Sequence, residues 1–152
     1  MYKTGQSSPD CNFSVNGYRL PSTDEWEYAA RGGVSGKRFP WGDTVTHNQA
    51  NYYSSSVYDY DISLTREWHP DYNDGDKPYT SPVGSFAPNG YGLYDMAGNI
   101  REWCNTASAS GTERYIRDSS WNYGAILMRC GFQYGSSPTF TFNNFGFRSV
   151  CR

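Results

Sequence analysis

The amino-acid sequence predicts an α+β domain with little regular secondary structure: one helix, a small antiparallel sheet and long irregular connections. Three observations lead to this fold class. Residues 20–33 carry start and stop signals of a helix, short segments after residue 113 alternate between apolar and polar residues, and the stretch from 34 to 80 has no sustained period of 3.6 or 2. The 152 residues fit a single domain over residues 1–152, large enough to bury a core.

The helix is predicted by the segment LPSTDEWEYAARGG. Ser22 and Glu25 have the spacing of a capping box, in which each side chain accepts a hydrogen bond from a backbone N–H at the start of the helix. The pair Gly32 and Gly33 can adopt the left-handed conformation that ends a helix. The residues expected to pack inward share one helical face: Trp26, Ala29 and Ala30.

The rest of the chain predicts loops and short strands. Residues 34–80 are rich in Tyr, Asp, Ser, Asn and Gly, and such a long irregular stretch must be held by something other than strand ladders. Residues 81–104 are divided by Pro82, Pro88 and Gly98 into turns and short strands. The segments RYIRDSSW, RCGFQY and FGFRSVC alternate as strands of a small antiparallel sheet do.

Composition excludes two classes of partner. The net charge is −2 and the Lys and Arg residues are scattered, whereas nucleic-acid binding needs a basic stripe. No apolar run reaches the length of a membrane span. Aromatic residues make up 18 % of the chain, with 14 Tyr, which is typical of recognition domains because Tyr combines contact area with a low entropy cost.

The four cysteines, Cys11, Cys104, Cys130 and Cys151, leave two interpretations open. They could form disulfides, of which a Cys11–Cys151 pair would join the two ends of the domain, or they could be buried free thiols. None lies in a CxxC motif and the chain has only two His, so a zinc site is not expected.

Four motifs resemble the formylglycine-generating enzyme (sulfatase-modifying factor) family: YRLPSTDEWEYAARGG, FPWGD, PVGSFAPNGYGLYDMAGNIREW and NNFGFRSVCR. They are collinear with the family from about Cys11 to the C-terminus. The resemblance implies a C-type lectin fold with two helices, a small twisted antiparallel sheet and bound calcium. Family members usually carry a further strand and helix before the RLP motif, so we expect that this chain is N-terminally trimmed.

The resemblance also bears on catalysis. The enzymes oxidise a substrate cysteine with copper held by two of their own cysteines, which follow a G-G-S-aromatic motif. That motif corresponds here to residues 118–121, and the two thiol positions correspond to Tyr123 and Met128. A phenol and a thioether cannot replace two thiolates around a soft metal. We therefore expect no copper and no enzymatic activity.

The C-terminal segment resembles a second group with this fold, the variable proteins of diversity-generating retroelements. In these systems a reverse transcriptase copies a template repeat with errors at adenines, so AAY codons change into many residues. The frame that such proteins keep corresponds here to Arg117, Ser120, Trp121, Asn122, Ala125, Arg129, Cys130, Pro138, Asn143, Asn144, Gly146, Phe147 and Arg148. The resemblance implies a hypervariable region over about residues 118–148.

The genetic code offers a check on this resemblance. Changing the first two bases of AAY never produces Lys, Glu, Gln, Met or Trp, and residues 118–152 contain no Lys and no Glu. We assign Trp121, Met128 and Gln133 to fixed or partly fixed positions, and Trp121, Phe145 and Phe147 to the core. The predicted ligand-binding residues are all reachable by these codon changes: Tyr123, Ile126, Leu127, Phe132, Tyr134, Ser136, Ser137, Thr139, Phe140 and Thr141. Aromatic residues among small polar neighbours are typical of binding surfaces, with core packing as the alternative.

A structural calcium ion is implied by YDMAGNIREW, which matches the family motif D/N-x-x-G-x-x-x-E. Asp95 and Glu102 would supply carboxylate oxygens, and Gly98 and Ile100 would supply carbonyls, toward the about six to eight oxygens that calcium requires. The alternative is a capped turn in which Glu102 pairs with an arginine. A second, weaker family site would use the residues Asn51, Tyr52 through its carbonyl, and Asp74 or Asp76.

The leading hypothesis is a non-catalytic, hypervariable ligand-binding protein that binds an unknown protein or surface ligand. We expect a monomer at a cell or phage surface or outside the cell, with the full-length chain as a lipoprotein. Two alternatives remain: a divergent formylglycine-generating-type oxidase, and a calcium-dependent sugar lectin. Against the lectin, the sequence lacks the E-P-N or Q-P-D and W-N-D signatures that bridge sugar to calcium.

Overall fold

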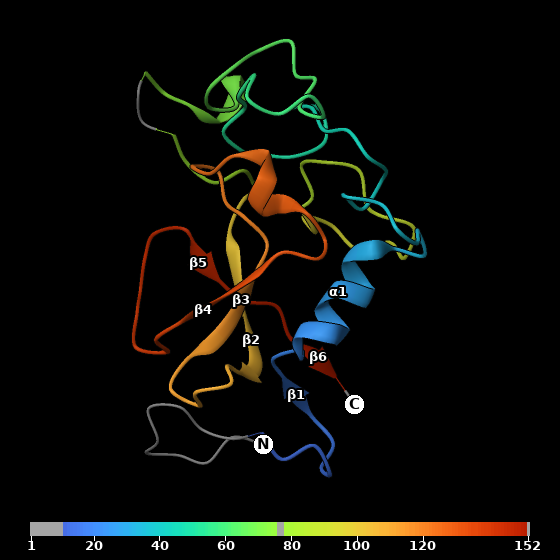
Figure 1. Ribbon diagram of the computed structural model, residues 1–152, viewed down its shortest axis with the longest axis vertical. Coiled ribbons are helices and arrows are strands. Elements are labelled where there is room, and N and C mark those ends of the chain that lie inside the picture. Colours follow the sequence, from blue (N-terminus) through green and yellow to red (C-terminus); the bar gives the residue numbers. More distant parts are fainter. Residues whose placement is uncertain (1–10, 76–77, 152) are drawn as a thin grey trace.

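The computed structural model describes residues 11–75 and 78–151. Figure 1 shows a helix beside a small sheet, with an irregular region at the far end of both. The elements in chain order are β1 (Tyr18–Arg19), α1 (Thr23–Arg31), the 3-10 helix η1 (Pro70–Tyr72), β2 (Arg101–Ala107), β3 (Arg114–Arg117), the 3-10 helix η2 (Ala125–Met128), β4 (Gln133–Ser136), β5 (Phe145–Gly146) and β6 (Val150–Cys151). Over these two ranges, α1 is the single α-helix where the family resemblance implied two, and no helix is long and apolar enough to cross a membrane.

Helix α1 forms as its local sequence predicts. The Ser22 hydroxyl accepts from the Glu25 N–H at 3.1 Å, and a Glu25 carboxylate oxygen accepts from the Ser22 N–H at 2.8 Å, which confirms the capping box. Gly32 ends the helix in the left-handed conformation, with φ of 54°. Trp26 and Ala30 are buried and Ala29 is half-buried, as expected for the inward face.

The main sheet has the strand order β4-β3-β2-β5. Strands β2, β3 and β4 pair antiparallel, whereas β5 pairs parallel with β2, so the sheet is mixed rather than purely antiparallel. The reason is the connection after β4, which carries the chain to the opposite edge of the sheet before β5 begins (Figure 1). The longest strand, β2, begins inside the segment for which the sequence predicted turns and short strands.

A separate two-stranded sheet joins β1 to β6 by antiparallel pairing of Tyr18 with Cys151 and of Arg19 with Val150. This pairing links the two ends of the described chain, the task that the sequence suggested for a Cys11–Cys151 bridge. Of these two cysteines, Cys11 is half-buried and Cys151 is exposed.

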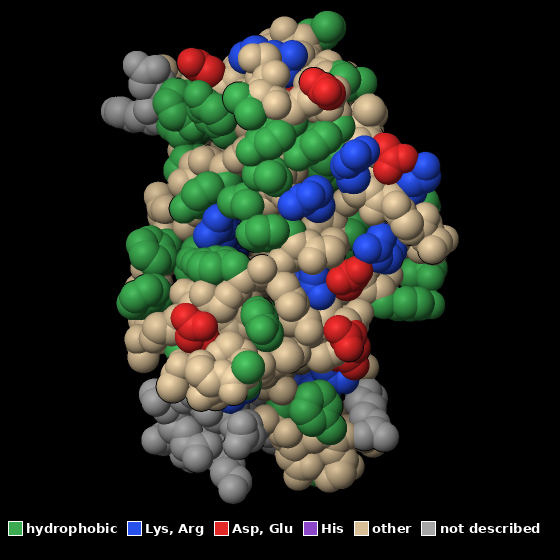
Figure 2. All heavy atoms as spheres, in the orientation of Figure 1, with side chains coloured by type: hydrophobic (Ala, Val, Ile, Leu, Met, Phe, Trp, Pro, Cys, Tyr) green, Lys and Arg blue, Asp and Glu red, His purple; other side chains and the backbone are tan. Residues whose placement is uncertain are grey.

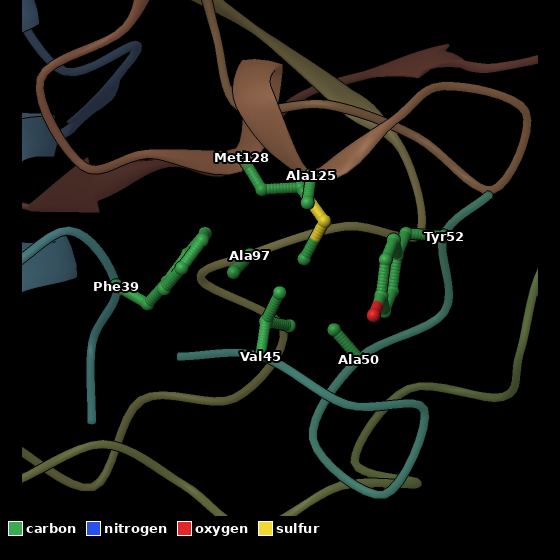
Figure 3. Close-up of a cluster of buried hydrophobic side chains, with 7 residues drawn as sticks. All are labelled: Phe39, Val45, Ala50, Tyr52, Ala97, Ala125 and Met128. Carbon is green, nitrogen blue, oxygen red and sulfur yellow. The ribbon is translucent and has the colours of Figure 1, made fainter. Parts of the chain in front are cut away.

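One hydrophobic cluster lies between the irregular region and η2 (Figure 3). Its side chains come from residues 39–52, from the turn before β2 and from η2, and all are at most 3 % exposed: Phe39, Val45, Ala50, Tyr52, Ala97, Ala125 and Met128. The irregular region is therefore anchored by burial of its own apolar side chains.

Hydrogen bonds to the buried carboxylate of Asp61 hold part of the irregular region. One oxygen accepts from the hydroxyls of Tyr52, at 2.7 Å, and Ser54, at 2.9 Å, and the other accepts from the Ser55 N–H at 2.8 Å. The Arg66 guanidinium lies 3.4 Å from the same carboxylate. These charge-assisted bonds satisfy two hydroxyls and one backbone N–H, and they hold this part of the chain without a strand ladder.

A second cluster joins α1 to the sheet and contains Trp26, Ala30, Met96, Cys104 and Cys130. Both cysteines are buried free thiols, which favours the thiol interpretation at these positions. Burial raises the pKa of Cys104 to about 12 and that of Cys130 to about 11, so both are protonated at neutral pH. They act as small apolar core residues.

Candidate ligand-binding face

The C-terminal segment rests on a buried frame of hydrogen bonds. The Asn144 amide donates to the Ser120 hydroxyl at 3.0 Å and to the Asn122 side chain at 2.9 Å, and the Ser120 hydroxyl donates to Asn122 at 2.7 Å. Ser120 and Asn144 are each at most 4 % exposed. The side chains of Ser120 and Asn144 therefore face inward and, together with the exposed Asn122, fix the backbone on which the neighbouring residues are carried.

Asp118 connects this frame to the turn before β2. It is fully buried in a left-handed conformation, with φ of 66°, and one carboxylate oxygen accepts from the N–H groups of Gly98, at 2.9 Å, and Ser119, at 2.6 Å. Burial raises the pKa of Asp118 well above its ordinary value. Asp118 thus belongs to the support of the segment and not to its exposed face.

Two of the predicted ligand-binding tyrosines meet around one arginine. The guanidinium carbon of Arg101 lies 3.9 Å from the ring centroid of Tyr123 and 5.0 Å from that of Tyr134. Tyr123 is 38 % exposed and Tyr134 is half-buried, whereas Arg101 is only 6 % exposed. The two rings therefore stack on the cation and keep part of their surface in solvent.

A row of aromatic rings continues from this point. Phe140 packs on Phe142, Phe142 on Phe145 and Phe145 on Trp103, with centroid separations of 6.0, 5.0 and 5.7 Å. Phe140 and Phe142 are more than half exposed. In Figure 2 the hydrophobic side chains gather over the upper left of the molecule. We call the following residues the aromatic face: Arg101, Trp103, Tyr123, Tyr134, Phe140, Phe142 and Phe145.

The remaining predicted ligand-binding residues are distributed less evenly. Thr139 and Thr141 are exposed, and Ser137 is half-buried beside them. Ile126 and Leu127 are half-buried on η2.

Phe132 lines a different, open cavity of about 430 Å³, together with the basic side chains Lys37, Arg38 and Arg129. The structure therefore brings some predicted residues together at the aromatic face and leaves Phe132 at another site.

Two sequence predictions in this segment are wrong. Ser136 was predicted to be displayed, but it is 4 % exposed at the end of the edge strand β4, where it pairs with Arg114 of β3. Phe147 was predicted to be core, but it is 67 % exposed. Phe147 follows the end of β5, and the next residue, Arg148, turns inward to pair with Glu102 while Phe147 points outward. Trp121, also predicted to be core, is half-buried.

Three residues of the aromatic face were missed by the sequence reasoning: Arg101, Trp103 and Phe142. The first two share a face only because they are two residues apart in β2, a strand that the local sequence did not predict. A sequence signal marks only the third. Phe142 belongs to the set that AAY codon changes can reach and lies directly after two predicted ligand-binding residues.

The predicted calcium ligands lie close together in the chain, but the guanidinium of Arg148 already pairs with the carboxylate of Glu102. Arg148 donates to Glu102 at 2.6 and 2.7 Å and to the Asp95 carbonyl at 3.0 Å, and Trp26 donates to Glu102 at 2.6 Å. One Asp95 carboxylate oxygen accepts from Gly84, and the other is buried without a partner among the described residues.

The four proposed ligands, Asp95, Gly98, Ile100 and Glu102, therefore do not fit a calcium ion while Arg148 holds Glu102. The geometry matches the alternative in which Glu102 pairs with an arginine. Over residues 11–75 and 78–151 no three His, Cys, Asp or Glu side chains group as a metal site.

The second predicted calcium set is also engaged in protein contacts. The Asn51 amide donates to the Tyr79 carbonyl at 2.9 Å, and the Tyr52 carbonyl lies 3.1 Å from a ring nitrogen of His47. Asp74 is exposed, and Asp76 lies outside the described residues.

The positions that hold copper in the resembling enzymes carry other chemistry here. Tyr123 stacks on Arg101, and Met128 is fully buried in the cluster of Figure 3. The nearest thiol in sequence, Cys130, is buried and protonated. A soft metal requires two thiolates, and Tyr123 and Met128 supply neither of them.

Helix α1, the curled mixed sheet and the hydrogen-bonded loops define a C-type lectin-like fold of the formylglycine-generating-enzyme type. The chain belongs to the sulfatase-modifying factor enzyme 1-like domain family, whose model matches residues 2–152. This confirms the fold class and the family that the sequence motifs predicted.

Relatives within the family differ in activity. The chain is 35 % identical over 148 residues to the inactive C-alpha-formylglycine-generating enzyme 2 of Mus musculus, covering 87 % of this chain and 42 % of that protein. It is 32 % identical over 151 residues to the formylglycine-generating enzyme of Mus musculus, covering 87 % and 38 %. The chain thus spans about two fifths of the length of these curated relatives.

Among solved structures, the chain is similar to Treponema denticola variable protein 1, with a TM-score of 0.72, 29 % identity, and coverage of 99 % of this chain and 53 % of that one. It is also similar to PvdO from Pseudomonas aeruginosa, with a TM-score of 0.66, 28 % identity, and coverage of 88 % and 52 %.

Proposed function

We propose that this chain is a non-catalytic ligand-binding protein whose C-terminal face is diversified by a retroelement, with a variable region over about residues 118–148. Its fold is similar to that of a variable protein over nearly its whole length. An inactive relative of the family's enzyme supports the view that the fold persists without catalysis.

One observation carries the proposal: a single segment divides into a buried frame and an exposed aromatic surface. The frame residues Ser120 and Asn144 are buried and hydrogen-bonded, whereas Tyr123, Phe140 and Phe142 are exposed. A diversified surface needs this division, because the changing side chains must not disturb the core that keeps the domain folded. Exposed aromatic rings beside small polar residues are also typical of binding surfaces.

The ligand in this proposal is a protein or another surface-bound molecule, and the chain acts as a monomer at a cell or phage surface or outside the cell. The aromatic face supports this, since contiguous exposed apolar surface marks an interaction site. Net charge of −2 and scattered basic residues do not suit nucleic acid.

Two measurements test the proposal. The first is genomic: we expect a near-copy of the DNA that encodes residues 118–148, differing only at adenines, beside a reverse transcriptase gene. The second is an assay of the purified protein with copper and a cysteine-containing peptide, in which we expect no oxidation. Copper-dependent oxidation of the peptide cysteine would overturn the proposal and restore the oxidase alternative.

A further inference from the structure

The strands of the main sheet present two faces of different character. Glu102 and Arg117 are in register and lie on the face toward α1, where Glu102 accepts from Trp26 and Arg117 contacts Glu27 at 3.0 Å. Arg101 is one residue before Glu102 and therefore points to the opposite face. No α-helix covers that face among the residues that the structure describes (Figure 1).

Arg101 is the unusual residue of this second face. It is 6 % exposed, its Nε is buried without an acceptor, and its guanidinium makes no ion pair or hydrogen bond to any described residue. The Nε of Arg117 also lacks an acceptor, but its other two nitrogens donate to Glu27 and to the carbonyls of Thr23 and Cys130. Cation–π contacts offset part of the desolvation of a guanidinium but leave its hydrogen-bond donors unsatisfied.

The surroundings of Arg101 are aromatic. Tyr123 and Tyr134 stack on the guanidinium, and Phe145, the partner of Arg101 in the parallel ladder, begins the ring row that leads to Phe142 and Phe140. A cation at the base of an apolar surface offers one strong polar contact to a ligand that otherwise buries apolar area.

We propose that Arg101 and the rings around it bind a carboxylate on an apolar support, such as an acidic side chain of a partner protein flanked by apolar residues. This rests on the proposed function and names the ligand chemistry of the same face. A planar guanidinium pairs with a carboxylate through two parallel hydrogen bonds, and the rings that exclude water strengthen the pair. A single guanidinium matches the one charge of a carboxylate better than the two charges of a phosphate.

The position of Arg101 in the chain adds a consequence. Arg101 lies on β2, before the proposed variable region, whereas Tyr123, Tyr134 and Phe140 lie within it. Diversification would change the rings and leave the cation in place. Each variant would keep the same carboxylate anchor and select its partner by the shape of the apolar surface around it.

The probe for this site is phenylacetate, compared with phenylacetamide, its neutral analogue of nearly equal shape. We expect a titration of the isotope-labelled protein followed by NMR to shift the side-chain Nε–Hε signal of Arg101 and the signals of Tyr123. We expect the amide to bind at least about tenfold more weakly, because it offers no charge to the guanidinium. Equal affinities, or no shift at Arg101, would overturn the proposal.

Substitutions of Arg101 provide a second test of the carboxylate site. Arg101→Gln should remove the preference for the acid over the amide, and Arg101→Lys should keep only part of it, since an ammonium lacks the planar fork. Arg129→Gln is the matched control, because Arg129 lines the other cavity. If the Arg101 variants fail to fold, as judged by circular dichroism, the comparison of acid and amide on the unmodified chain still decides the question.

The outcome also separates this proposal from the proposed function. A protein ligand whose affinity falls with Tyr123→Ala but not with Arg101→Gln would leave the binding face intact and overturn the carboxylate site. Copper-dependent oxidase activity together with binding of phenylacetate at Arg101 would overturn the proposed function and leave the carboxylate site intact.

Discussion

At the scale of single residues, two aromatic side chains differ sharply in burial. Trp26 is 1 % exposed and its Nε1 donates to Glu102, whereas Phe147 is 67 % exposed. We expect Trp26→Ala to lower the free energy of unfolding by about 3 to 5 kcal/mol, because it removes a fully packed ring and a buried hydrogen bond. Phe147→Ala should change it by less than about 0.5 kcal/mol. Urea denaturation of both variants measures the difference, and similar losses would contradict the outward placement of Phe147.

A second single residue, Tyr123, tests what the aromatic face contributes to ligand affinity. Tyr123 leaves 38 % of its surface in solvent while it stacks on Arg101. We expect Tyr123→Ala to weaken a protein ligand of the aromatic face by about 2 kcal/mol or more, the loss typical of a central aromatic contact. The matched control is Tyr28→Ala, since Tyr28 is an exposed tyrosine on α1. Calorimetric titration of both variants checks this, and a large fall in the melting temperature of Tyr123→Ala would instead assign the ring to the core.

At the scale of elements, the irregular region depends on the carboxylate of Asp61. It is 3 % exposed and accepts from the Tyr52 and Ser54 hydroxyls and the Ser55 N–H. We expect Asp61→Asn to lower the free energy of unfolding by about 2 to 4 kcal/mol, because the NH₂ group of the amide would face a donor from which the carboxylate now accepts a hydrogen bond. Asp59→Asn, on an exposed neighbour, should cost less than about 0.5 kcal/mol. Thermal unfolding measures both, and a stable Asp61 variant would show that apolar burial alone holds the region.

Elements differ in how far local sequence predicts them. The Ser22 and Glu25 side chains bond within one turn, so the start of α1 is visible in the sequence. The contact of Arg101 with Tyr134 spans many residues and three strands, and no periodicity reports such a contact. Local rules also miss the burial of Ser136, which lies opposite Arg114 in the pairing of β3 with β4. The frame was predictable from motifs, whereas the cation beneath the aromatic face required the register of the sheet.

At the scale of the whole molecule, Glu102 ties three distant parts of the chain together. It accepts from Trp26 on α1, lies on the central strand β2, and pairs with Arg148 just after β5. Burial alone would lower the pKa of Arg148, but the hydrogen bonds and charge of Glu102 raise it above its ordinary value. The guanidinium therefore keeps its charge, and the ion pair closes the C-terminal segment against the helix and the sheet.

A prediction distinguishes neutralisation of Glu102 by Arg148 from binding of a structural calcium ion by Glu102. If Arg148 neutralises Glu102, a chelator should leave the melting temperature of the unmodified chain unchanged, because removing an ion that does not bind alters no equilibrium. Arg148→Met should lower the free energy of unfolding by about 3 kcal/mol, since it leaves a mostly buried carboxylate without its cation. Lys37→Met, which breaks the exposed pair with Asp43, is the control and should cost less than about 1 kcal/mol. Differential scanning calorimetry with and without chelator measures all three. A fall in the melting temperature of the unmodified chain on chelation would show that Asp95 and Glu102 bind calcium after all, with Arg148 displaced from the site.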